Sequence, residues 1–479
     1  MTLPNAEQLT AQRSTFARLL ARVVSIEPGE MRATMLACVY FFFLLASYFI
    51  LRSIRDAVGV QAGIKTLPYL FSATFFATLL LNPLFAKIVS RLPVRKFIPI
   101  VYRVFGGCAL CFAVALRWAP LKGQPWLTQA LTSAGLPSVI TSHLPATNEA
   151  WFIPAFWIWT SVFSLFVPSV FWGFMSDNFR SEQSKRLYGF IGVGGTLGAL
   201  AGSGITALLA ERVGTSVLLV FSAIMLELGV QCVAFFPASF RTETREREET
   251  ARPIGGSSLA GFTHVLKSPY MLGICAFMML YTIGTTVLYF QQAEIVKAAF
   301  SEQSTRTAFL AKIDFAVQLL TITAQIFVTG RVIKWLGVGI TLAILPVMSV
   351  IGFTALGAFP TITLFVIFST LRRAGNNAFA SPGREVLYTV VAPEDKYKAK
   401  NLIDTFVYRT GDQIGAWSYK AVSETAHLAI TSISFMAAPM SLVWLGVGLW
   451  LGRQHVIMTA NEERISILPK RAPVPAMTA

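Results

Sequence analysis

Residues 33–51 read ATMLACVYFFFLLASYFIL, a stretch of nineteen residues without a charged side chain. An apolar run of this length crosses the hydrocarbon core of a bilayer, about 30 Å thick, as an α-helix. Eleven further apolar runs follow along the chain, 54% of all residues are hydrophobic and only 13% are charged, which excludes a soluble globular protein. We therefore predict an all-α membrane protein with twelve transmembrane helices. The predicted spans are 33–51, 66–86, 97–116, 151–174, 187–210, 216–236, 270–290, 309–329, 336–359, 361–370 and beyond, 402–419 and 428–451.

The spans are arranged in two sets of six, separated by a polar stretch that includes RTETREREE at 241–249. Two pairs of segments, each pair six spans apart, indicate a duplication: KIVSRLPV at 87–94 with RVIKWLGV at 331–338, and GGTLGA at 194–199 with GDQIGA at 411–416. This organisation resembles the two-bundle major facilitator fold. The predicted divisions are an N-terminal segment 1–32, a first six-helix bundle 33–236, an inter-bundle loop 237–268, a second six-helix bundle 269–451 and a tail 452–479.

The fifth predicted span is rich in glycine, with seven glycines between Gly189 and Gly204. A nucleotide-binding glycine loop would need a preceding β-strand, which a transmembrane helix does not supply. Small residues at helical spacing instead allow two helix backbones to approach closely. We therefore interpret these glycines as a packing surface, on which helices could also slide during transport.

The basic surplus of the chain, a net charge of +16, serves mainly as a topology signal. If the N-terminus is cytoplasmic, 28 of the 40 Lys and Arg residues lie in predicted cytoplasmic segments and 10 on the outer side, with Lys312 at the start of the eighth span counted among these 10. Residues 1–32 lack the layout of a cleaved signal peptide, so we expect the first span to be retained. The prediction is a multi-pass protein of a bacterial inner membrane, with both termini in the cytoplasm and no nucleic-acid partner.

The cysteines and histidines give no sign of a metal or cofactor. All five cysteines lie in apolar spans, and although Cys108 and Cys111 form a C-x-x-C pair, no histidine or acidic residue is close to them in sequence. The four histidines lie in loops. We expect small buried side chains rather than ligands, and no bound cofactor.

Ionisable residues within spans are the candidates for a substrate site, because each costs about 2.5 to 3.5 kcal/mol at the centre of a bilayer. Arg52, Arg55 and Asp56 follow the first span and share one helix face, since their spacings are three and four residues. Two arginines at the outer end of a span run against the usual distribution of basic residues. The alternative explanation is that they extend to the membrane surface.

A second cluster lies in the eleventh span, where Asp404, Tyr408 and Asp412 repeat every four residues and Arg409 is one turn from Asp412. Either these residues bind a substrate or coupling ion, or Arg409 and Asp412 form a helix-stabilising ion pair. Arg103 in the third span is a further candidate; the alternative is that it extends to the inner membrane surface, since it lies only seven residues past Lys96.

Several segments resemble the ATP/ADP antiporters of plastids and obligate intracellular bacteria, which are related to the major facilitators. FILRSIRD at 49–56 is similar to the family's ILRDxKD segment, and KNLID at 400–404 resembles its GKAAID stretch. FWGF at 171–174, followed by EQSKRLYGFIG at 182–192, matches the family's FWGF and EAKRFYxxFG strings at the same spacing. The likeness extends over the whole chain.

The resemblance implies a nucleotide antiporter, but with altered charges along its pathway. Arg55 stands where the family places a functional lysine. The family's acidic residues in spans four and seven fall at Thr160 and Tyr289, and its lysine in span eleven falls at Asp412. Only the first of these four charges keeps its sign, so the resemblance implies membership with a changed substrate preference.

We expect an alternating-access secondary transporter and not an enzyme, in which Arg55 and Arg409 attract an anionic small molecule such as a nucleotide, organic phosphate or carboxylate. Asp56, Asp404 and Asp412 would balance these charges or carry a proton. The aromatic residues of span four, including Trp157, either stack on a substrate ring or form an interfacial belt. Two alternatives remain: a proton-coupled exporter of drugs or metabolites, and an integral-membrane enzyme, for which the sequence shows no catalytic constellation. We expect a monomer whose partners are its solute and the lipid bilayer.

Overall fold

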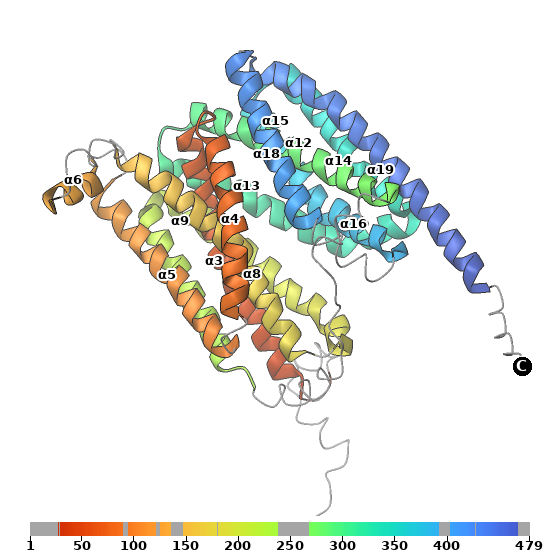
Figure 1. The fold of residues 1–479 in the computed structure, drawn as a ribbon, viewed down its shortest axis with the longest axis horizontal. Coiled ribbons are helices and arrows are strands. Elements are labelled where there is room, and N and C mark those ends of the chain that lie inside the picture. The colour runs from red at the N-terminus through yellow and green to blue at the C-terminus, as the bar shows by residue number, and fades with distance from the viewer. Residues whose placement is uncertain are drawn as a thin grey trace, which may run out of the picture. The chain divides into compact units, whose positions relative to one another are not determined.

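The computed structural model describes Glu27 and residues 29–89, 94–120, 125–135, 147–179, 181–237, 268–391, 403–426 and 428–467. Every regular element in these residues is helical, and no strand occurs among them. By packing, the chain forms two units: Met1–Pro253 with Val296–Gln318, and Ile254–Ile295 with Leu319–Ala479. Figure 1 labels the helices of both units.

In the described residues, the first unit contains six complete helices, the end of α12 (Pro269–Ala299) and the beginning of α13 (Gln303–Ala324). The six complete helices are α3 (Met31–Ala62), α4 (Leu67–Val89), α5 (Val94–Trp118), α6 (Trp126–Ser133), α8 (Asn148–Asn178) and α9 (Ser181–Ala234). Helix α9 is broken at Gly214, whose φ of 78° is a left-handed conformation that only glycine adopts easily. Helix α3 packs against α8 and α9, and α5 packs against α9.

Helices α3 and α9 of the first unit pack closely against each other. Three α9 glycines, four residues apart, face the α3 backbone, and a side chain at any of them would collide with it. Gly194 meets Cys38, Gly198 meets Phe42 and Gly202 meets Ala46. The interpretation of the span-five glycines as a packing surface is therefore confirmed.

The second unit contains most of α12 (Pro269–Ala299), the end of α13, and α14 (Gly330–Ala358), α15 (Ile362–Gly375), α16 (Ser381–Leu387), α18 (Tyr408–Lys420) and α19 (Ile430–Ile467). Short π-helical segments lie at η2 (Gln325–Thr329), η3 (Asn376–Ala380), η5 (Ile403–Val407) and η6 (Ala421–Thr425), and a 3₁₀ turn, η4, at Tyr388–Val390. Its core brings α12, α14, α16 and α19 together around the buried side chains Phe277, Leu342, Leu387 and Trp444.

The second unit repeats the glycine contact of the first. Gly411 and Gly415 of α18, four residues apart, lie against Met279 and Ile283 of α12, which are also four residues apart. In the first unit, Gly194 and Gly198 make the same kind of contact with Cys38 and Phe42 of α3. The aligned segments 194–199 and 411–416 thus occupy corresponding packing positions, which supports the predicted duplication.

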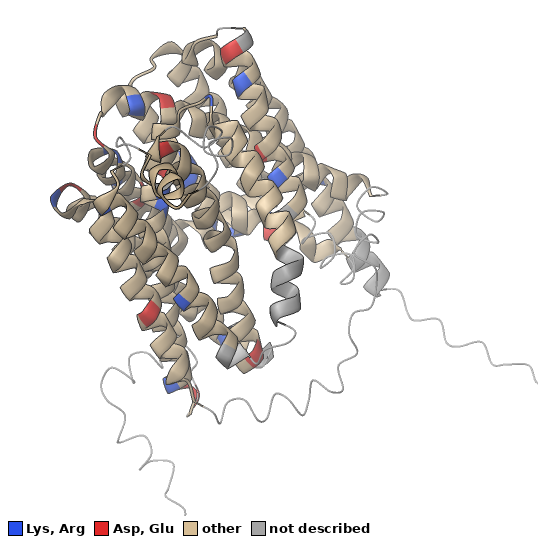
Figure 2. Cartoon of the chain, turned by 60° about the vertical axis from the view of Figure 1, so that its left-hand side comes forward, with Lys and Arg blue, Asp and Glu red and all other residues tan. Residues whose placement is uncertain are grey.

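Seven helical stretches in the described residues are long and apolar enough to cross a membrane, fewer than the twelve predicted. Two of them, Arg186–Ala234 and Gln303–Ala358, each join two predicted spans across a non-helical glycine, Gly214 or Gly337. Three other predicted spans are not long and apolar enough to be counted among the seven. The helix of the second span is apolar only over Leu67–Leu81, and the helices of the tenth and eleventh spans, α15 and α18, have 14 and 13 residues. Charged residues are sparse along the helices (Figure 2).

One expectation about a basic residue is corrected by the helix boundaries. We expected Arg372 to start a cytoplasmic loop after the tenth span, but α15 continues to Gly375 and therefore includes Arg372. The helical backbone continues here past the point where the hydropathy of the sequence falls.

Candidate functional site

The end of α3 forms a cluster of charged side chains in the first unit. The Arg55 guanidinium donates two hydrogen bonds to Oδ1 of Asp56, from Nε at 3.1 Å and from Nη2 at 2.8 Å. Nε of Arg52 lies 3.8 Å from Oδ2 of Asp56, one helical turn away. The Asp56 carboxylate therefore contacts both arginines; the contact with Arg52 is the one predicted by the spacing of four residues, whereas Arg55 is its neighbour in the sequence.

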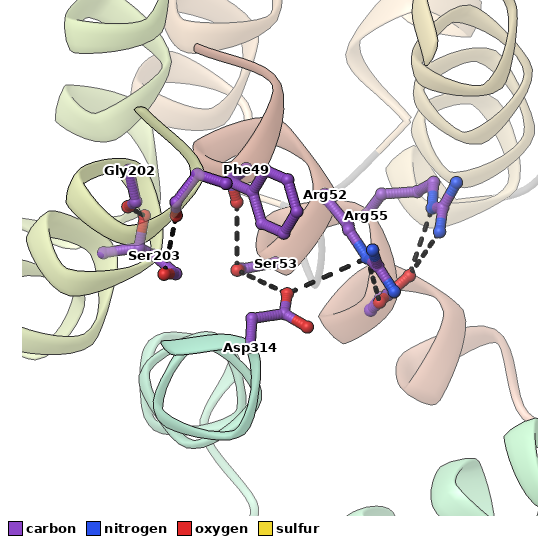
Figure 3. A network of polar contacts seen from close by, with 10 residues as sticks. Phe49, Arg52, Ser53, Arg55, Gly202, Ser203 and Asp314 are labelled. Carbon is purple, nitrogen blue, oxygen red and sulfur yellow. Dashed lines mark hydrogen bonds and ion pairs between the residues drawn. The ribbon is translucent and has the colours of Figure 1, made fainter. Parts of the chain in front are cut away.

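Asp314 of α13 completes this cluster, and the sequence analysis did not identify it. Its Oδ2 lies 3.8 Å from Nε of Arg52 and accepts a hydrogen bond of 3.5 Å from the Ser53 hydroxyl (Figure 3). Only 1% of Asp314 is exposed. Two arginines and two carboxylates thus form a cluster with no formal net charge. The sequence did contain a signal for Asp314: it is an acidic residue within the apolar span 309–329, where burying a charge in the membrane is costly.

Aromatic rings complete the surroundings of both arginines. The Arg55 guanidinium carbon lies 5.2 Å from the ring centre of Trp157 on α8, and that of Arg52 lies 5.5 Å from the Phe49 ring. At these distances the ring faces attract a cation. Both arginine side chains keep part of their surface exposed, at 17% and 25%, so an anion can reach them. Trp157 is buried over Arg55, which favours a role in the site over an interfacial belt.

The second cluster, on α18, forms the ion pair expected from its spacing. Nη1 of Arg409 lies 3.5 Å from Oδ2 of Asp412, and Oδ1 of Asp412 accepts a hydrogen bond of 3.3 Å from the Thr286 hydroxyl of α12. The ring of Tyr408 lies 6.5 Å from that of Tyr281. The Asp404 side chain lies outside the described residues.

Arg372 is a second residue that the sequence analysis missed, because it was assigned to a loop. Its guanidinium donates to the Ser349 hydroxyl (3.0 Å), the Thr285 hydroxyl (3.0 Å) and the Tyr281 carbonyl (3.3 Å). It also lies 5.4 Å from the Tyr281 ring and 5.9 Å from the Trp444 ring. Among the described side chains no carboxylate pairs with it, although only 2% of Arg372 is exposed. Burying an unpaired charge costs several kcal/mol, at least about 3.

Three other predicted residues lie outside these clusters. Arg103 donates two hydrogen bonds to Glu227 of α9, at 3.0 and 2.9 Å, on an exposed surface where 58% of the arginine side chain and 43% of the glutamate side chain are accessible. Thr160 is fully buried and its hydroxyl donates to the Phe156 carbonyl at 2.8 Å. Tyr289 is half-buried on α12.

Comparison with known proteins gives the family of the chain. The sequence profile described as TLC ATP/ADP transporter matches residues 9–373, about three quarters of the chain. The chain belongs to the TLC ATP/ADP transporter family. It is 21% identical to ADP,ATP carrier protein 1 of Chlamydia muridarum, over 94% of this chain and 93% of the relative, and 20% identical to ADP,ATP carrier protein 1 of Chlamydia pneumoniae, over 95% and 97%.

Solved structures show which fold this TLC transporter shares. A variant of the nucleoside transporter NupG superposes with a TM-score of 0.58 at 14% identity, over 90% of this chain and 99% of that chain. A bacterial homologue of the iron transporter ferroportin, facing inward, gives 0.57 at 11% identity, over 89% and 100%. A D-xylose-proton symporter gives 0.56 at 10% identity, over 89% and 97%. The TLC transporter is therefore an integral multi-pass membrane protein with the fold of major-facilitator-type transporters.

Proposed function

We propose that this TLC transporter has twelve transmembrane crossings in two six-helix bundles and exchanges an anionic solute, with a phosphate or carboxylate group, by alternating access. Both termini would face the cytoplasm of a bacterium, and one copy would form the transport unit. The arginine pair Arg52 and Arg55 supports this most directly. Two partly exposed guanidinium groups within a bundle otherwise poor in charge are suited to binding an oxyanion.

The carboxylates of the cluster explain how the arginines are held before a solute arrives. Asp56 pairs with both arginines and Asp314 with Arg52, so each arginine has an acid partner within the protein. A phosphate or carboxylate that enters must compete with these internal acids for the guanidinium N–H groups. Binding therefore replaces one anionic partner of the arginines with another. This replacement reduces the free-energy cost of desolvation when the solute binds. Trp157 would lie beside the bound group, over Arg55.

The buried acids also favour one alternative, a proton-coupled exporter. Asp56, Asp314 and Asp412 are all buried, and a carboxylate paired with arginine in a membrane protein can accept a proton during transport. The two functions differ in their driving force. Exchange of one anion for another needs no proton gradient, whereas a proton-coupled exporter stops when that gradient is dissipated.

Counterflow in proteoliposomes tests the proposal. Vesicles loaded with ATP, ADP, inorganic phosphate or a dicarboxylate should take up the same labelled anion with the proton gradient dissipated. R55M should reduce uptake at least about tenfold, the loss expected for a charge-assisted contact, and R103M should leave it unchanged. ATP and ADP should be weak substrates, because the positions Thr160, Tyr289 and Asp412 lack the family's charges. Uptake that requires a proton gradient would favour the exporter, and the absence of any anion counterflow would contradict the proposal.

Cysteine labelling tests the crossings and the position of the termini. In a variant without the five native cysteines, a cysteine at Ser133 in α6 should react only from the outside of the cell. A cysteine at Thr244, in the predicted inter-bundle loop, should react only from the cytoplasmic side. Labelling of both positions from the same side would contradict the twelve-crossing topology.

A further inference from the structure

Some N–H groups of Arg372 and Trp444 have no hydrogen-bond acceptor among the described residues. A guanidinium has five N–H groups, and the three hydrogen bonds to Ser349, Thr285 and Tyr281 leave one N–H on each terminal nitrogen without an acceptor among the described residues. The adjacent Trp444 is 1% exposed, and its indole N–H also has no hydrogen-bond partner. Unpaired donors are rare in protein interiors.

The position of these donors in the fold is fixed by four helices of the second unit. Arg372 extends from α15, Thr285 and Tyr281 lie on α12, Ser349 on α14 and Trp444 on α19. The three oxygens that accept from Arg372 are all neutral, so they orient the guanidinium without cancelling its charge. The aromatic rings of Tyr281 and Trp444 lie over the cation and shield it from other partners.

From this geometry we propose that Arg372 is an anion-binding residue of the second unit, and that it takes an oxyanion of the phosphate or carboxylate type carried by the transported solute. The two remaining N–H groups on the terminal nitrogens suit the two oxygens of such a group, and the Trp444 indole supplies a further donor. For a ligand to reach Arg372, the Tyr281 or Trp444 side chain must move aside, because both rings lie over the guanidinium. This inference rests on the proposed anion transport, but it concerns a residue separate from the arginine pair of the first unit.

Arg373 provides a matched control for the experiment, since it has the same charge, follows Arg372 directly and is less buried. Binding of inorganic phosphate is measured by calorimetry and by thermal shift on purified, delipidated R372M, R372K and R373M, all in an R52M/R55M background that removes the first cluster. Phosphate should bind the background protein and R373M alike, within about twofold, and R372M at least about tenfold more weakly. R372K should fall between them, because lysine keeps the charge without the planar fork.

Four outcomes would overturn the inference. Phosphate binding that persists in R372M would place the anion elsewhere. A shift that appears only when phosphatidylglycerol vesicles are added would identify a lipid headgroup as the ligand. A loss of stability in R372M that is restored in R372M/D404N would identify Asp404 as an internal counter-ion. If R55M abolishes counterflow while R372M transports normally, the proposed function stands and this inference fails. If no anion is transported at all, the phosphate measurement still tests Arg372 by itself.

Discussion

Asp314 of α13 lies 3.8 Å from the Arg52 side chain of α3 and accepts a hydrogen bond from Ser53, a residue 261 positions earlier in the chain. The acid that completes the arginine cluster therefore comes from the half of the sequence opposite to the arginines. Because Asp56 also faces both arginines, the cluster has two positive and two negative charges. Its affinity for an anion should depend on how strongly these internal acids compete with the solute.

The first prediction is that D314N increases the affinity for the transported anion. The substitution removes one negative charge while the side-chain oxygen can still accept from Ser53. The cluster then has a net positive charge, so the Michaelis constant for the solute should fall about three- to tenfold, a change typical of one nearby charge. Maximal exchange should fall as well, because the anion leaves more slowly. Counterflow kinetics measure both quantities.

S53A is the matched control for that variant, since it removes the hydrogen bond to Asp314 but keeps every charge. Its Michaelis constant should match that of the wild type. Without solute, D314N should also melt at a lower temperature, since Arg52 loses one of its two acid partners, and added anion should restore the melting temperature. An unchanged affinity of D314N for the transported anion would show that Asp314 has only a structural role.

The second prediction concerns the exposed ion pair of Arg103 and Glu227. The surrounding residues on the same surface, including Val104 and Ile224, are exposed and apolar, which is typical of a surface in contact with lipid. We expect R103M to leave the Michaelis constant and maximal rate of exchange within about twofold of the wild type, since exposed pairs contribute little. A tenfold loss of transport in R103M, with normal amounts of folded protein, would return Arg103 to the substrate site.

The sequence predicted the features that depend on local spacing. Arg52 and Asp56 were expected on one face because residues four apart on a helix are neighbours, and Arg409 and Asp412 pair for a similar reason. The glycines at helical spacing predicted a close packing surface on the fifth span, and the structure identifies α3 as the helix that packs on it. The family resemblance came from strings such as FWGF at 171–174.

The sequence did not predict contacts between distant helices. Asp314 reaches Arg52 only because α13 packs with the first unit, and that arrangement depends on the fit of whole helix surfaces. Arg372 was missed for a related reason: the apolar run before it ends near Thr370, and only the environment formed by α12, α14 and α19 shows that the helix continues as a buried element. Hydropathy reflects the free-energy cost of burying a residue in the membrane. Contacts with residues that are distant in the sequence can offset this cost, and hydropathy does not include them.

The third prediction tests the contact between α3 and α9. In G198A, the new methyl group would collide with the Phe42 backbone, so the helices must separate and the free energy of unfolding should fall by about 1 to 3 kcal/mol. G192A is the control, because no atom lies within 4 Å of a side chain built there. It should be neutral or slightly stabilising, since alanine favours helix more than glycine does. Melting temperatures in detergent compare the two variants, and equal values would show that the contact is not tight.

The last prediction separates the two explanations of Arg409 and Asp412. If Arg409 binds the anion, R409M should reduce counterflow at least about tenfold, the loss of a charge-assisted hydrogen bond. It should also lower the melting temperature, because the buried Asp412 carboxylate loses its ion pair with Arg409. The double variant R409M/D412N removes both charges, so its melting temperature should recover while its transport stays low. If Arg409 and Asp412 only stabilise α18, the double variant should instead recover both stability and transport.

The single variant D412N completes the double-mutant cycle. Because Arg409 then no longer pairs with a carboxylate at position 412, this variant should bind the anion more tightly and show an altered dependence of exchange on pH. A double variant with normal stability and normal counterflow would remove α18 from the substrate site.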